Sequence, residues 1–155
     1  MGILPHKDVG RALELAFSLD IPFFPQLPRR SFYEDMHVQL SSNFPGISLD
    51  LDEKKINFSH EKFLSELDKY FEADDDFFRL RYPYSEVYED FLGRDLSGFY
   101  AVRGQVTGPV SFGFRVFDEE GKPIIYHDDV REILFDFVVR KVNVCLLYTS
   151  PSPRD

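Results

Sequence analysis

The sequence predicts an α/β fold, and three observations carry that prediction. The chain opens with two short apolar runs separated by an amphipathic stretch, which is the pattern of a strand–helix–strand unit with parallel strands. Alternating apolar residues around a charged turn at 52–55 indicate an inserted β-hairpin. Val130, Ile133, Leu134, Phe137 and Val138 form an apolar stripe at helical spacing near the end of the chain.

The first half of the chain divides into short elements with clear end signals. We expect strands at 2–4 and 21–24, because each apolar run is closed by a proline. Helices are expected at 8–19, 31–40 and 59–71, and Ser31 and Ser59 are suitable N-caps for the last two. The hairpin is expected at 47–58, and Asp74–Asp76 is expected to end the third helix as a solvated acidic cluster.

The second half predicts a further strand, a further hairpin and two helices. A short helix is expected at 85–92, ended by Gly93. Residues 98–107 alternate well enough to predict the best strand of the chain, and Gly108–Pro109 ends it. Residues 112–126 predict a second hairpin that turns at 118–121, and 128–142 predicts a long helix. Together these elements are typical of the N-terminal part of an incomplete (β/α)₈ TIM barrel with β-hairpin insertions, since a complete barrel takes about 250 residues.

The last eleven residues, Cys145–Asp155, do not continue the pattern of the helix before them. Back-translated with permitted codons, they resemble a transposase adapter used in preparing sequencing libraries, whereas by composition they also resemble a natural Ser/Pro-rich linker. We expect 145–155 to be a non-native, adapter-derived tail. The expected domain is therefore residues 1–144, the N-terminal fragment of a longer protein from an assembled environmental sequence.

Composition excludes several classes of partner. The net charge of −9 argues against nucleic acid and against an anionic membrane surface. No apolar run approaches the roughly 20 residues that span a bilayer. Residues 1–144 contain no cysteine, which suits a reducing compartment, so we expect a cytoplasmic protein.

Three loops that follow the expected strands contain the candidate binding residues. The first loop contains His6, which could hydrogen-bond a substrate, although a helix-capping or merely solvated histidine is the simpler interpretation. The second contains Gln26 and Arg29 on a loop that Pro25 and Pro28 stiffen, and an arginine there suits a carboxylate or phosphate. The simpler interpretation is that Arg29 and the adjacent Arg30 pair with surface acids such as Glu34 or Asp35, and at least one of the two is expected to do so. The third loop supplies four candidates, namely Gln105, Thr107, Gly108 and Ser111, although a plain strand-end turn also accounts for them.

Taken in order, these loops resemble the superfamily of cobalamin-independent methionine synthase and uroporphyrinogen decarboxylase. The resemblance rests on Gly2–His6, on Pro22–Arg29 and on the Thr-Gly-Pro-Val-Ser segment at 107–111, and it extends over residues 1–144. It implies a TIM-barrel methyltransferase similar to methionine synthase, which transfers a methyl group to a thiol substrate from a folate or a corrinoid protein. The family's zinc is held by residues of the later half of the barrel, so zinc is expected in the intact protein and not in this fragment.

At one position the chain departs from the family pattern, because Ile3 stands where a serine would help to hold the amino-acid substrate. Two alternatives therefore stay open: a uroporphyrinogen decarboxylase-like enzyme that binds carboxylates with arginines, and a non-catalytic binding paralogue. The sequence identifies no catalytic residue. The fragment by itself is expected to be inactive and to aggregate, since an incomplete barrel leaves strand edges unpaired.

Overall fold

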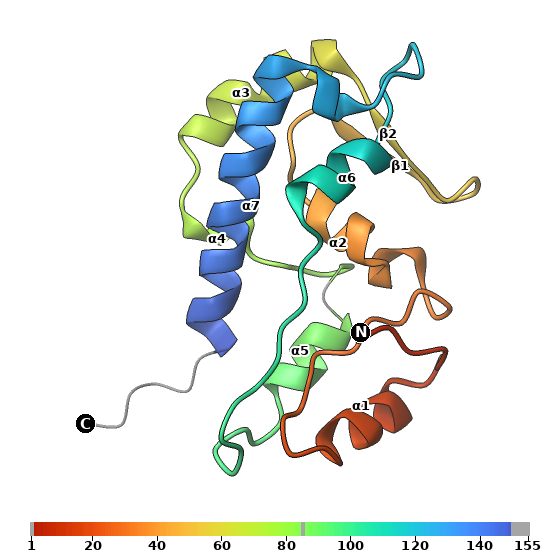
Figure 1. Ribbon diagram of the computed structural model, residues 1–155, viewed down its shortest axis with the longest axis vertical. Coiled ribbons are helices and arrows are strands. Elements are labelled where there is room, and N and C mark those ends of the chain that lie inside the picture. The colour runs from red at the N-terminus through yellow and green to blue at the C-terminus, as the bar shows by residue number, and fades with distance from the viewer. Residues whose placement is uncertain (1, 85, 150–155) are drawn as a thin grey trace. The chain divides into compact units, whose positions relative to one another are not determined.

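The computed structural model describes residues 2–84 and 86–149 and shows a mixed α/β protein (Figure 1). The chain divides into two compact units that are interleaved in sequence. The first unit contains residues 1–39 and 80–106 together with the chain from 145 onward. The second contains residues 40–79 and 107–144.

The first unit is built around two helices and the loops between them. Helix α1 (Val9–Phe17) begins at Asp8, whose side chain accepts a hydrogen bond from the Arg11 N–H at 2.8 Å. A short 3₁₀ helix, η1 (Phe32–Glu34), follows Ser31, and helix α5 (Glu86–Leu92) ends at Gly93. Its buried apolar residues form one core, which comprises Ala12, Leu13, Phe24, Leu27, Val87, Tyr88 and Phe91.

Parallel pairing is present in this unit, but the strands predicted at 2–4, 21–24 and 98–107 are reduced to isolated bridges. Ile3 pairs with Gln26 and Phe23 pairs with Arg103, both in the parallel sense. Pro22 and Pro25 explain the short ladders, because neither has an N–H to donate. The strand predicted at 98–107 is therefore wrong, and Tyr100 in it is 99% exposed.

The second unit contains the predicted first hairpin. Helix α2 (Met36–Ser41) begins in the first unit and ends in the second, where strands β1 (Ile47–Asp50) and β2 (Lys55–Phe58) pair antiparallel, with Ile47 opposite Phe58. Helix α3 (His60–Phe71) begins after Ser59, as predicted.

Two predictions for the second unit are wrong. Asp74 does not end a helix; its side chain accepts hydrogen bonds from two backbone N–H groups and begins the short helix α4 (Asp75–Phe78). The hairpin predicted at 112–126 is also wrong, because helix α6 (Pro109–Arg115) and the 3₁₀ helix η2 (Ile124–Tyr126) occupy its two ends. Pro109 stands at the start of α6, where its missing N–H costs nothing, and the predicted turn at 118–121 survives between the bridged Phe117 and Pro123.

The long predicted helix is present as α7 (Asp128–Thr149) and supplies much of the second unit's core. Phe137 is fully buried and packs against Phe44 and Phe78, with ring centroids 5.2 Å and 5.6 Å away. Lys141 is also buried, and its Nζ donates to the carbonyl and hydroxyl oxygens of Ser42 at 2.9 Å and 2.8 Å. The helix extends beyond Val142, where it was predicted to end, into the segment that begins at Cys145.

Candidate functional site

The first unit brings the ends of its three parallel segments together. The Gln26 N–H donates to the Gly2 carbonyl at 2.8 Å, and the Gln26 carbonyl accepts from the Leu4 N–H at 3.0 Å. Arg103 pairs in the same way with Pro22 and Phe24, at 2.8 Å and 3.1 Å. Since the carboxyl ends of parallel segments meet at one edge, the loops that begin after Leu4, Gln26 and Arg103 start from a common edge.

Two of the predicted site residues, Gln26 and Gln105, contact each other at this edge. Gln105 Nε2 donates to Gln26 Oε1 at 3.4 Å, and Gln105 Oε1 accepts from the Gly2 N–H at 2.7 Å. Gln26 is buried and Gln105 is half-buried. These contacts join all three segments through side chains as well as through the backbone.

The contacts continue inward to two residues that the sequence analysis did not select. Gln26 Nε2 donates to Gln39 Oε1 at 3.1 Å, and Gln39 Nε2 donates to Glu34 Oε2 at 3.1 Å. We call Gln105, Gln26, Gln39 and Glu34 the glutamine network. It runs from a half-buried amide to a fully buried carboxyl group, because the relative exposure of Glu34 is 0%.

Burial changes the acidity of Glu34. Loss of solvent and, to a smaller extent, the nearby Glu86 raise the pKa of its carboxyl group, while the Val87 N–H and Arg30 lower it, and the net result is a pKa of about 7. The Val87 N–H donates to Glu34 Oε1 at 3.3 Å. Glu34 was expected at most as a surface partner of an arginine.

The two adjacent arginines behave differently, as predicted, but the partner of Arg30 is not the one expected. Arg30 forms a two-point ion pair with Glu86 on α5, and its Nη1 donates to the Lys7 carbonyl at 2.9 Å. Glu34 and Asp35 do not pair with it, because Glu34 is turned into the core. Arg29 is exposed and makes no hydrogen bond or ion pair with the residues that the structure describes.

Three of the predicted site residues, Thr107, Gly108 and Ser111, belong to the second unit, where they begin helix α6. Gly108 has an ordinary φ of −69°, and a Cβ added to it would meet nothing within 4 Å. The local backbone therefore does not require glycine at this position. Thr107 is buried, and Ser111 is exposed.

One side-chain atom in each unit is buried without a hydrogen-bond partner among the described residues. These atoms are His6 Nδ1 and Thr107 Oγ1. Buried polar atoms in native proteins are nearly always satisfied, so these two atoms stand out among the polar groups of the described residues. The predicted helix-capping role of His6 is not seen, since Asp8 caps α1.

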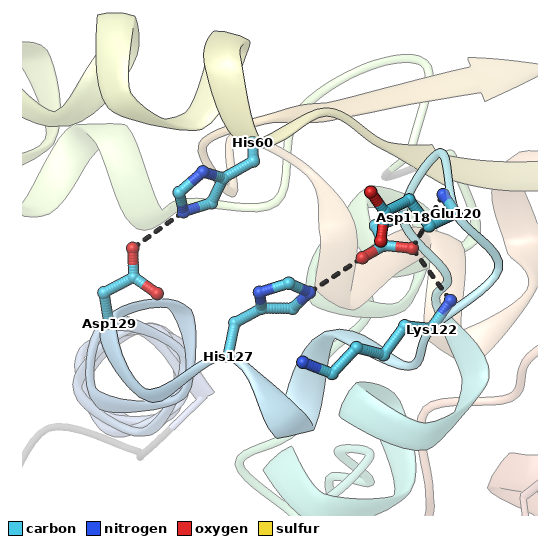
Figure 2. A network of polar contacts seen from close by, with 6 residues as sticks. All are labelled: His60, Asp118, Glu120, Lys122, His127 and Asp129. Atoms are coloured by element: carbon cyan, nitrogen blue, oxygen red, sulfur yellow. Dashed lines mark hydrogen bonds and ion pairs between the residues drawn. The ribbon is translucent and has the colours of Figure 1, made fainter.

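A second polar cluster lies in the second unit (Figure 2). His60 Nε2 contacts Asp129 and His127 Nε2 contacts Asp118, both at 2.8 Å, and the two imidazole rings stack with centroids 5.7 Å apart. Asp118 also accepts from the N–H groups of Glu120 and Lys122, at 3.0 Å and 2.8 Å. The two histidines are 67 residues apart in the sequence, and the fold brings their rings together.

The Asp118 carboxylate is held in its ionised form. Burial by itself would raise its pKa, but hydrogen bonds from the Lys122 N–H, from His127 and from the Glu120 N–H together lower it. The cluster therefore fixes the turn at 118–121 and links α3 to the start of α7. Each imidazole ring contacts one aspartate carboxylate through Nε2, and this contact fixes the orientation of the ring.

The described residues do not offer a site that fits zinc. No group of three or more His, Cys, Asp or Glu side chains within 2–84 and 86–145 is placed to hold a metal ion.

Among the helices of the described residues, none combines the length and the apolar character needed to cross a membrane.

Comparisons with known proteins identify no relative of this chain. No family model, curated protein or solved structure matches the chain.

Proposed function

We propose that this chain is the N-terminal part of a TIM-barrel methyltransferase resembling cobalamin-independent methionine synthase. In the intact protein the reaction is methyl transfer to a small thiol, with a folate or a corrinoid protein as donor. The motifs at 2–6, 22–29 and 107–111 carry the resemblance. The parallel pairing of Ile3 with Gln26 and of Phe23 with Arg103 agrees with the start of such a barrel.

The observation that carries the proposal is the meeting of Gln26 and Gln105 at the carboxyl edge of the parallel segments. In barrels of this class the loops after the strands build the substrate site. Each glutamine amide nitrogen has two N–H donors, and the described contacts of these two residues use one on each. The remaining N–H groups suit an oxygen acceptor on a small polar substrate.

The role proposed for these residues is to bind and orient the substrate. Amides that are already fixed by neighbours lose little entropy when they engage a ligand, so they hold it in one orientation. Arg29, which is exposed, supplies a cation on the same loop as Gln26 for an anionic part of either reactant.

The decarboxylase-like alternative has less support. It needs several cations that converge on substrate carboxylates, and Arg30 is instead bound to Glu86 and the Lys7 carbonyl. This leaves Arg29 and Arg103 among the three arginines that the sequence offered, and both are exposed.

The test is a methyl-transfer assay on the full-length gene product, including any sequence that follows residue 144. Methyl-folate and methyl-corrinoid are supplied in turn with a thiol acceptor, and thioether formation is followed by mass spectrometry. Q105A is expected to lower kcat/KM by about tenfold to a hundredfold, because it removes hydrogen bonds to the substrate. The control is E61Q on α3, an exposed acid of the second unit, which should leave the rate unchanged.

Absence of thioether with both donors would reject the methyltransferase. Tight binding of a polycarboxylated porphyrin by the same protein would favour the decarboxylase-like enzyme. Thiol binding without turnover would favour the non-catalytic paralogue.

A further inference from the structure

The direction of every hydrogen bond in the glutamine network is fixed from both of its ends. At the inner end, Gln39 Nε2 faces two acceptors, Glu34 Oε2 at 3.1 Å and the Tyr84 carbonyl at 3.2 Å. Both N–H groups of that nitrogen are therefore used, and Gln39 Oε1 must face Gln26. At the outer end, the Gly2 N–H requires an acceptor, and Gln105 Oε1 provides it at 2.7 Å.

The opposite direction of the network is strongly disfavoured. If every amide were turned over, Gln39 Oε1 would face the Tyr84 carbonyl, acceptor against acceptor, whatever the protonation state of Glu34. Gln105 Nε2 would then face the Gly2 N–H, donor against donor. Because Glu34, Gln26 and Gln39 are all buried, water would not satisfy the groups that lost their partners.

We propose that Glu34 and Gln39 are positioning residues that make the site a hydrogen-bond donor. By accepting from Gln39, Glu34 turns the amide nitrogen of Gln26 toward Gln39, and the carbonyl of Gln26 in turn orients Gln105. The free N–H of the half-buried Gln105 then faces the ligand, so the site selects an oxygen acceptor such as a carboxylate over an ammonium group. This inference rests on the proposed function only in taking Gln105 as a substrate contact.

The direction of the amides is measured directly by NMR. The side-chain NH₂ signals of Gln26, Gln39 and Gln105 are assigned from single variants of the full chain and compared in E34Q and E86Q. E34Q replaces an acceptor with a group that also donates, so all three signals are expected to move. E86Q removes the acid that pairs with Arg30 and acts on Glu34 through its charge, so the three signals are expected to move much less than in E34Q.

Ligand selection is measured with two thiols, 3-mercaptopropionate and cysteamine. In both, two methylene groups separate the thiol from the charged group, which is a carboxylate in the first and an ammonium group in the second. The wild-type chain is expected to prefer 3-mercaptopropionate, and E34Q to reduce that preference by about tenfold, the effect of one hydrogen bond to a charged group. E86Q is expected to keep the preference. A merely structural role of Glu34 would weaken both thiols equally.

The two measurements separate this inference from the proposed function. Unchanged Gln26 and Gln105 signals in E34Q, or a wild-type preference for cysteamine, would overturn the positioning role. Signals that move while neither thiol binds the wild type would support the positioning role and count against thiol binding as the function. If E34Q does not fold, Q39M interrupts the network without touching Glu34, and the same shift of Gln26 and Gln105 is required.

Discussion

The buried carboxyl group of Glu34 makes stability depend on pH in a direction opposite to that of most acids. Its pKa is raised from 4.5 to about 7 by burial, so the folded state holds a proton that the unfolded state has already released. Below pH 4.5 both states are protonated and the cost of the buried charge is absent. As pH rises from 4.5 through about 7, stability is lost, and above that range the full cost is present.

The magnitude follows from the two pKa values. A tenfold change in proton affinity is worth about 1.4 kcal/mol, so the gap between 4.5 and about 7 corresponds to about 3 kcal/mol. This is a large part of the roughly 5–15 kcal/mol that holds a typical domain folded. E34Q removes the titration, so the difference in free energy of unfolding between wild type and E34Q should change by about 3 kcal/mol across this range.

The assay is urea denaturation at several pH values from about 4.5 to 8, spanning both pKa values of Glu34. Circular dichroism is the suitable signal, because the chain is rich in helix and contains no tryptophan. E61Q, which removes an exposed acid from α3, should follow the wild type at every pH. A difference between wild type and E34Q that stays constant with pH would refute the argument.

Other substitutions give results that urea denaturation or thermal melting can check. G46A should lower the free energy of unfolding by about 2–4 kcal/mol, because Gly46 has a φ of +82° and an added Cβ would lie 2.7 Å from the Phe58 ring. G108A should change it by no more than about 0.5 kcal/mol, because a Cβ added there meets open space. F137A should lose about 3–5 kcal/mol and F71A less than about 1 kcal/mol, since Phe137 is fully buried and Phe71 is 62% exposed; equal losses would contradict the assigned core. D118N should lose about 1 kcal/mol at neutral pH. The lowered pKa of Asp118 means that this loss should shrink as pH falls below 3.8, and a loss that grew on acidification would contradict the assignment.

The helices and the first hairpin could be predicted because their signals are local. Asp8 caps α1 by accepting a hydrogen bond from the N–H of Arg11, only three residues later in the sequence. The hairpin at 47–58 likewise pairs residues that are close in sequence. The alternation at 98–107 was equally clear, yet it gave a single bridge. Strand formation depends on a partner, and the partner segment contains Pro22 and Pro25.

The candidate site was predictable in its outer residues and not in its inner ones. Gln26 follows one expected strand and Gln105 stands near the end of another. Parallel pairing of those segments brings the two residues together, although they are 79 residues apart in the sequence. Glu34 is a charged residue beside two arginines, a pattern that indicates a surface ion pair. Its burial depends on Val87, 53 residues away, and no local pattern contains that information. Zinc, the thiol and the methyl donor stay predictions from the resemblance.

The interleaving of the two units has a consequence for synthesis on the ribosome. Residues 40–79 emerge before residues 80–106, but their unit is completed only when residues 107–144 follow. At about 5–20 residues per second, the 65 residues from 80 to 144 take about 3–13 s to make. During that time Phe44 and Phe78 exist without Phe137, against which both pack in the finished protein. The nascent chain thus presents aromatic side chains to chaperones for seconds, and removing α7 by truncation would make that transient state permanent.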